Sequence, residues 1–189
     1  MLALVLRGAG WRPTFVIGGD VNEVGTNAAY DDGEWFVVEA DESDGTFLVL
    51  PRAAAIVTNV EPDHLEHYGG WPQLRAAFER FATDTPGPVV CCADDDGARS
   101  LADATPGVVT YGKRDTADYR MVGLDRHRGG VRFDLERGGA VLAPALRPRS
   151  RSRPVQTRRP RPRPTLLRRG GLAVRPAGRG CMIGSAPDV

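Results

Sequence analysis

Lysine, cysteine and aromatic residues are all scarce in this sequence of 189 residues. It has one lysine, three cysteines, two of them adjacent, and an aromatic content of 7%. So few cysteines fit neither a disulfide framework nor a zinc site, and we expect a reducing, cytoplasmic setting. There is no run of about 18 apolar residues and no pattern of a secretory signal, so we expect no membrane association.

Charge is unevenly distributed along the chain. Residues 147–189 contain 12 arginines and one acidic residue, Asp188, whereas the preceding residues are rich in acids. The last aromatic residue is Phe133. The change in composition predicts an ordered domain over residues 1–142 and a separate Arg/Pro-rich tail over 143–189.

Short apolar runs alternate with amphipathic stretches over residues 1–142, which is typical of an α/β fold. We expect a mainly parallel sheet with flanking helices. The predicted helices span 2–9, 71–83 and 98–104, and the predicted strands span 15–17, 35–39, 53–60, 88–93 and 108–111. A glycine pair between two further runs, 119–124 and 131–135, predicts a hairpin.

The tail shows no apolar periodicity, and we expect it to be disordered or polyproline-like. Two interpretations stay open. Arginine without lysine, among Pro, Gly and Ala, is what an out-of-frame reading of GC-rich DNA yields. A basic arm that binds nucleic acid or another polyanion is the alternative. The tail has no aromatic side chain for base stacking, which makes nucleic acid the less favoured partner.

Acidic loops follow two of the predicted strands. The first loop is Glu39–Asp44 (EADESD), and the second is Asn59–His64 (NVEPDH). Ligands of open α/β sheets collect at the carboxyl ends of strands, and carboxylates suit Mg²⁺. His64 can join such a site as a neutral imidazole. The two loops therefore indicate either a magnesium site or two solvated acidic turns.

Other motifs are less informative. Residues 107–113 (GVVTYGK) match the start of a phosphate loop, but Arg114 stands where Ser or Thr is required, and the middle of the motif is typical of a strand. Cys91 and Cys92 lie in an apolar run and are expected to be buried. Asp94–Asp96 is expected to cover a strand-to-helix turn.

Three ordered motifs resemble the central domain of the Mur ligase family: IGGDVNEVGTNA (17–28), EADESDGTFL (39–48) and TNVEPDHLEHYG (58–69). The similarity is greatest to members that join L-alanine to UDP-N-acetylmuramate in peptidoglycan synthesis. A ligase that reattaches recycled murein peptide ranks second. The resemblance implies that ATP activates the muramate carboxylate as an acyl phosphate, which the amine of L-alanine then attacks, with Mg²⁺ as cofactor.

The resemblance also implies residue roles. Glu39 and His64 match magnesium ligands, whereas Thr26 and Asn27 fall where the family approaches the UDP-sugar. Asn59 and Asp63 are assigned to no particular family position, and we expect them to support the ligands without touching the metal.

The chain departs from the family pattern in several places. The phosphate loop G-T-x-G-K-T-[ST] is absent, as are an H-N-x-x-N-A helix and the flanking domains that bind the UDP-sugar and complete the ATP site. We therefore expect an incomplete central domain that is inactive alone. Without the strand before the phosphate loop, we also expect an unpaired sheet edge prone to aggregation.

Overall fold

The computed structural model describes residues 1–21, 23–127, 130–143 and 181–185. Most of the tail, for which we expect disorder, lies outside the described residues, as does the tip of the predicted hairpin. The helices are α1 (Leu2–Gly8), the 3-10 turn η1 (Thr46–Leu48), α2 (Leu65–Tyr68), α3 (Trp71–Thr83) and α4 (Asp96–Ala104). The strands are β1 (Thr14–Val21), β2 (Thr26–Ala29), β3 (Phe36–Ala40), β4 (Ala54–Val57), β5 (Val89–Cys92), β6 (Val109–Gly112), β7 (Tyr119–His127), β8 (Gly130–Arg137), β9 (Ala140–Ala143) and β10 (Cys181–Ser185).

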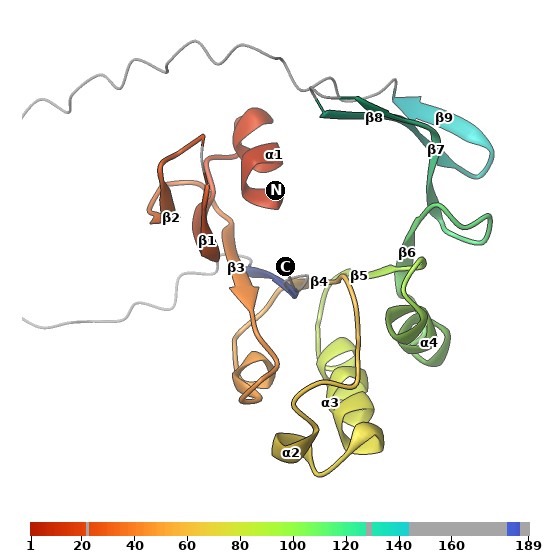
Figure 1. The fold of residues 1–189 in the computed structure, drawn as a ribbon. Coiled ribbons are helices and arrows are strands. Elements are labelled where there is room, and N and C mark those ends of the chain that lie inside the picture. The colour runs from red at the N-terminus through yellow and green to blue at the C-terminus, as the bar shows by residue number, and fades with distance from the viewer. Residues whose placement is uncertain (22, 128–129, 144–180, 186–189) are drawn as a thin grey trace, which may run out of the picture.

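Within the described part of the chain, the strands form one ten-stranded sheet in the order β2-β1-β3-β10-β4-β5-β6-β7-β8-β9. In the run β1-β3-β10-β4-β5-β6-β7, every neighbouring pair of strands is parallel. The outer pairs β1–β2, β7–β8 and β8–β9 are antiparallel. Helix α1 lies on one side of the sheet, and α2, α3 and α4 lie on the other (Figure 1). The predicted α/β class with a mainly parallel sheet is confirmed.

Two apolar clusters hold the helices to the sheet. The larger one joins α3 and α4 to β4 and β5, and it includes Leu74, which is fully buried. The smaller one packs Ala3 and Leu6 of α1 against Phe15 and neighbouring strand residues. Burying each large side chain of this kind contributes roughly 1.5–3 kcal/mol, which explains why short helices with few caps are retained.

The sequence pattern located most elements but not their ends. Helix α3 spans the predicted residues, whereas the predicted strand 53–60 is shorter, because residues 58–60 already belong to the loop that follows β4. Strand β1 continues through the glycine pair Gly18–Gly19, and the stretch around Thr26 forms β2 rather than a loop. Strand β9 and helix α2 were not predicted.

Strand β10 is a five-residue exception to the expectation of a tail without structure. Cys181–Ser185 pairs in parallel with β3 on one side and β4 on the other. An uncharged segment can occupy such a central position because both adjacent strands satisfy its backbone hydrogen-bonding groups. The expected open edge at this point is therefore also wrong, because the described sheet has its edges at β2 and β9. None of the described helices has the length and apolar character needed to cross a membrane.

Candidate functional site

The parallel strands β1, β3, β4, β5 and β6 end at the same edge of the sheet. Two acidic loops follow β3 and β4 at this edge, as the sequence predicts. We refer to residues 39–45 and 58–68 together as the acidic crest. It lies where ligands bind in open α/β sheets.

Glu39 lies at the end of β3 and reaches across to β1. Its Oε2 accepts a hydrogen bond from the backbone N–H of Gly18 at 2.9 Å. A Cβ at position 18 would lie 3.7 Å from Oε1, so the Glu39 carboxylate lies close to the Gly18 backbone on the side where other residues carry a side chain. The contact fixes one oxygen of Glu39, and the other accepts no hydrogen bond within the described residues.

The two loops of the acidic crest contact each other directly. The Tyr68 hydroxyl donates a hydrogen bond to the backbone carbonyl of Glu42. The imidazole of His67 lies over Gly45, where an added Cβ would be 3.1 Å from Nε2. The His67 and Tyr68 rings meet edge to face with centroids 4.8 Å apart. Two acidic segments that are distant in the sequence therefore form one surface.

Charge at the acidic crest is predominantly negative. The pKa of Asp41 is lowered mainly by the backbone N–H of Ser43, with further lowering from the Ser43 side chain and from nearby His64. The pKa of Tyr68 is raised, first by burial and then by the carboxylates of Glu42 and Asp44. Asp41 is thus ionised at neutral pH, and its negative charge favours a bound cation. Tyr68 remains a neutral hydrogen-bond donor.

His64 takes an unusual backbone conformation before α2. Its φ of 50° and ψ of 31° lie in the left-handed region, which is uncommon for a residue other than glycine. Its N–H donates to Oδ1 of Asp63 at 2.7 Å, and its Nε2 lies 3.8 Å from Oδ2 of the same residue. The imidazole therefore lies beside Asp63.

The predicted magnesium ligands do not form a closed cage. No hydrogen bond or ion pair joins Glu39 to His64, and among the described side chains no three His, Cys, Asp or Glu residues converge on a metal position. Mg²⁺ commonly takes only one or two protein carboxylates and completes its shell with water and substrate phosphates. One anchored carboxylate, Glu39, with ionised Asp41 close by in the same loop, fits that requirement.

The other predicted site residues are spread along the same edge. Thr26 pairs with Val21 at the carboxyl end of β1, and its hydroxyl donates to the carbonyl of Ala28 at 3.0 Å. Asn27 is exposed on the edge strand β2, and β1 separates it from Glu39. The side chain of Asn59 accepts a hydrogen bond from the hydroxyl of its neighbour Thr58 at 2.8 Å.

Asp95 anchors the acidic crest, a role that the sequence alone did not indicate. Its Oδ1 accepts hydrogen bonds from Ala98 N–H at 2.7 Å, as the N-cap of α4, and from Val60 N–H at 3.0 Å. An acid near this helix start was expected, and its second bond became visible only in the fold. One oxygen thereby ties the loop before His64 to the first turn of α4.

Replacing Asp95 with alanine is expected to lower the free energy of unfolding by about 2 kcal/mol. The change removes the helix cap and leaves the Val60 N–H without its partner. Urea unfolding followed by circular dichroism measures the loss. Asp96→Ala is the matched control, because the Asp96 side chain is 79% exposed and makes only exposed ion pairs. Equal losses in the two variants would contradict the anchoring role.

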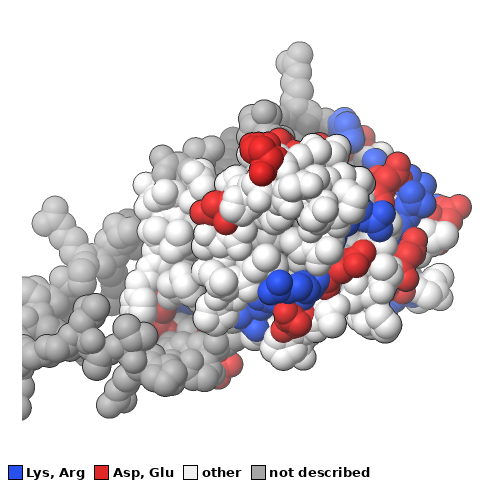
Figure 2. Space-filling view, turned by 90° about the horizontal axis from the view of Figure 1, so that it is seen from below, with Lys and Arg blue, Asp and Glu red and all other residues white. Residues whose placement is uncertain are grey.

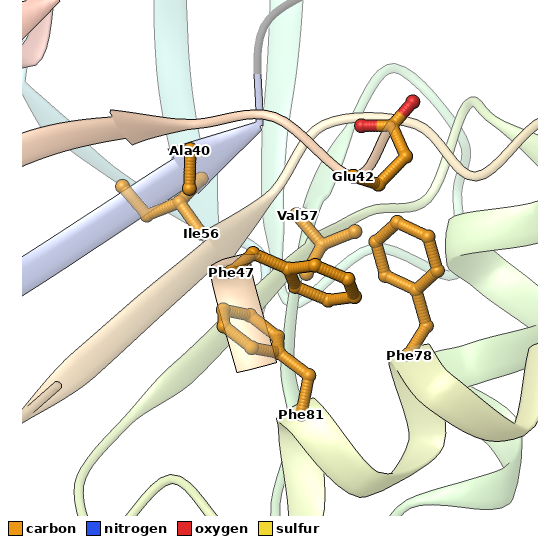
Figure 3. Close-up of a pocket in the computed structure, with 7 residues that line it drawn as sticks. All are labelled: Ala40, Glu42, Phe47, Ile56, Val57, Phe78 and Phe81. Atoms are coloured by element: carbon orange, nitrogen blue, oxygen red, sulfur yellow. The ribbon is translucent and has the colours of Figure 1, made fainter. Parts of the chain in front are cut away.

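Residues beneath the acidic crest form packing rather than a pocket. The Phe47 ring lies between those of Phe78 and Phe81, with both centroids 5.1 Å away, and the carboxylate of Glu42 turns away from the cluster (Figure 3). The space among these residues is about 10 Å³, room for about one water molecule. Phe47 thus fixes the end of the first acidic loop on the core.

On the face that carries α2–α4, acidic and basic side chains of the described residues are intermixed toward one side, beside a largely uncharged surface (Figure 2). The Arg/Pro-rich tail, where binding of a polyanion is the alternative prediction, lies almost entirely outside the described residues.

Comparison with known families gives one consistent match, to the Mur ligase middle domain over residues 19–143. The chain is 46% identical over 148 residues to the UDP-N-acetylmuramate–L-alanine ligase of Salinispora arenicola, with coverage of 75% of this chain and 29% of that protein. It is 44% identical over 139 residues to the enzyme of the same name from Rhodospirillum centenum, covering 72% of this chain and 29% of the relative. The chain thus spans less than a third of the length of these relatives.

Solved structures agree with the sequence comparison. The UDP-N-acetylmuramate-alanine ligase of Thermotoga maritima superposes with a TM-score of 0.64 and 29% identity, over 75% of this chain and 32% of that protein. A UDP-N-acetylmuramate:L-alanyl-gamma-D-glutamyl-meso-diaminopimelate ligase from Neisseria meningitides gives a TM-score of 0.59 at 24% identity, over 74% of this chain and 48% of that protein. The second likeness concerns the fold alone.

Proposed function

The chain belongs to the Mur ligase family, and from this we propose that it supplies the middle-domain part of an ATP-dependent ligase for peptidoglycan synthesis. The substrates that we propose are UDP-N-acetylmuramate and L-alanine, which appear in the names of the relatives at 44–46% identity. The observation that carries the proposal is the position of Glu39, held by Gly18 at the carboxyl edge of the parallel sheet.

In the proposed reaction, the γ-phosphoryl group of ATP passes to the muramate carboxylate, giving an acyl phosphate and ADP. The amine of L-alanine then attacks the carbonyl carbon, loses a proton, and expels phosphate as the amide forms. Negative charge develops on phosphoryl and carbonyl oxygens in both steps, and bound Mg²⁺ supplies the compensating positive charge. The acidic crest contributes by holding such a cation in place.

Individual residues then have distinct proposed roles. Glu39 would hold the magnesium ion, and His64 is the candidate ligand from the second loop. Asp63 and Asn59 orient that loop through their contacts with neighbouring backbone and side-chain groups. Thr26 and Asn27 are the candidates for contact with the UDP-sugar. The proposed domain spans residues 1–142.

Glu39→Gln is expected to weaken Mg²⁺ binding by at least about tenfold, since changing residues that merely orient metal ligands already costs 10–100-fold. The amide oxygen of glutamine can still accept the Gly18 hydrogen bond, so the variant removes charge while keeping the local structure. Isothermal titration of the full chain with Mg²⁺, with and without ATP, measures the change.

Glu34→Gln is the matched control for this titration. Glu34 is exposed just before β3, at the opposite end of that strand from Glu39, and loses the same charge. Unchanged Mg²⁺ affinity in Glu39→Gln, or an equal loss in both variants, would remove Glu39 from the metal site.

A chimera tests the ligase assignment itself. Residues 19–143 of this chain would replace the matched segment of the Salinispora arenicola ligase, and phosphate release would be followed with ATP, UDP-N-acetylmuramate and L-alanine. We expect release that requires both substrates and disappears in the chimera carrying Glu39→Gln. A folded chimera that releases no phosphate with L-alanine would contradict the proposed substrates.

A further inference from the structure

Strands β3 and β4 follow each other in the chain but are not neighbours in the sheet. A full strand position separates them, and β10 occupies it, as the blue arrow beside β3 shows (Figure 1). We refer to this position between β3 and β4 as the strand slot. Both of its walls are strands that run in the same direction, and β10 pairs in parallel with each of them.

The occupant pairs along the whole of one wall. Residues 181–185 match residues 36–40 of β3 one for one, and residues 182–184 match residues 54–56 of β4. An empty slot would leave unpaired N–H and C=O groups on both walls in the middle of the sheet. Such groups carry a large penalty unless another strand pairs with them.

The segment that fills the slot is separate from the segment that builds it. The family match covers residues 19–143 and ends before β10, whereas β3 and β4 both lie inside it. Pairing in a sheet is made by the backbone, so it demands an extended, proline-free segment more than any particular sequence. The slot therefore has the properties of a binding site for an extended peptide.

We propose that the strand slot is a strand-acceptor site, filled in cis by Cys181–Ser185 and equally able to bind a peptide of that sequence supplied in trans. The ligand class is an extended segment of about five residues without proline that adds as a parallel strand. This inference is independent of the proposed enzymatic function, because it concerns only backbone pairing between β3, β4 and their occupant.

Amide hydrogen exchange on the unaltered full chain is the first test. If β10 fills the slot, the amides of β3 and β4 exchange at least about tenfold more slowly than those of the edge strand β2. Exchange in β3 and β4 as fast as in β2 would show an unfilled slot and would overturn the proposal.

The second test vacates the slot with Ile183→Pro in the full chain. Proline lacks an N–H and is excluded from the interior of sheets, so protection of β3 and β4 should fall at least about tenfold. Val141→Pro in the edge strand β9 is the matched control and should leave that protection unchanged. A fluorescent peptide of residues 179–187 should bind the Ile183→Pro protein and restore protection, whereas the same peptide carrying proline at position 183 should not bind.

Competition with the unaltered protein completes the test. Its own β10 competes at an effective concentration on the order of 1 mM, so the peptide should bind at least about tenfold more weakly than to Ile183→Pro. A concentration-dependent dimer that the peptide dissociates would show a second copy's strand in the same slot and would support the proposal. The proposal would be overturned by a folded Ile183→Pro protein in which the amides of β3 and β4 keep full protection, or which does not bind the peptide. If Ile183→Pro does not fold, the exchange rates of the unaltered chain decide.

Discussion

Gly97→Ala is expected to lower the free energy of unfolding by about 3 kcal/mol or more. A Cβ at this position would lie 1.9 Å from the carbonyl oxygen and 2.9 Å from the carbonyl carbon of Val60. The Val60 carbonyl cannot rotate away from the added methyl group as a flexible side chain can. The first turn of α4 and the loop before His64 would therefore have to move apart. Chemical denaturation followed by circular dichroism measures the loss.

The same substitution is expected to impair the acidic crest, because Val60 is also the residue that Asp95 holds. Mg²⁺ binding measured by titration should therefore weaken in any Gly97→Ala protein that remains folded. Gly8→Ala is the matched control, since nothing lies within 4 Å of the Cβ that it adds. Equal free energies of unfolding for Gly97→Ala and Gly8→Ala would contradict the close contact between α4 and Val60.

Phe47→Ala is expected to cost about 3–5 kcal/mol of unfolding free energy. The Phe47 side chain is 3% exposed and contacts the rings of Phe78 and Phe81, so its removal opens a cavity that rigid neighbours cannot fill. The loss also detaches η1, which immediately follows the first acidic loop. Thermal and urea unfolding of the variant give the magnitude.

Val49→Ala is the control for this truncation. Val49 lies two residues further along, and its side chain is 78% exposed. Its removal should change stability by no more than about 0.5 kcal/mol. Similar losses for the two variants would show that Phe47 is not part of the buried cluster.

The pattern of residues predicted the two acidic loops more accurately than the chain's outer elements. Glu39 lies at the end of one apolar run and His64 in the loop after another, and parallel strands end at one edge. The prediction did not extend to the contacts that shape the edge. The bond of Glu39 to Gly18 spans 21 residues and that of Asp95 to Val60 spans 35. No local pattern encodes such pairs.

The sequence by itself determined the α/β class, the position of α3 and the two acidic loops, because each depends on residues close together in the chain. The tertiary structure alone decided the strand order, the anchoring of the crest by Asp95 and the placement of β10 between β3 and β4. Backbone pairing in a sheet joins groups regardless of their separation in sequence. A five-residue uncharged segment after an arginine-rich stretch therefore becomes a central strand only when a slot with two unsatisfied walls is available to receive it.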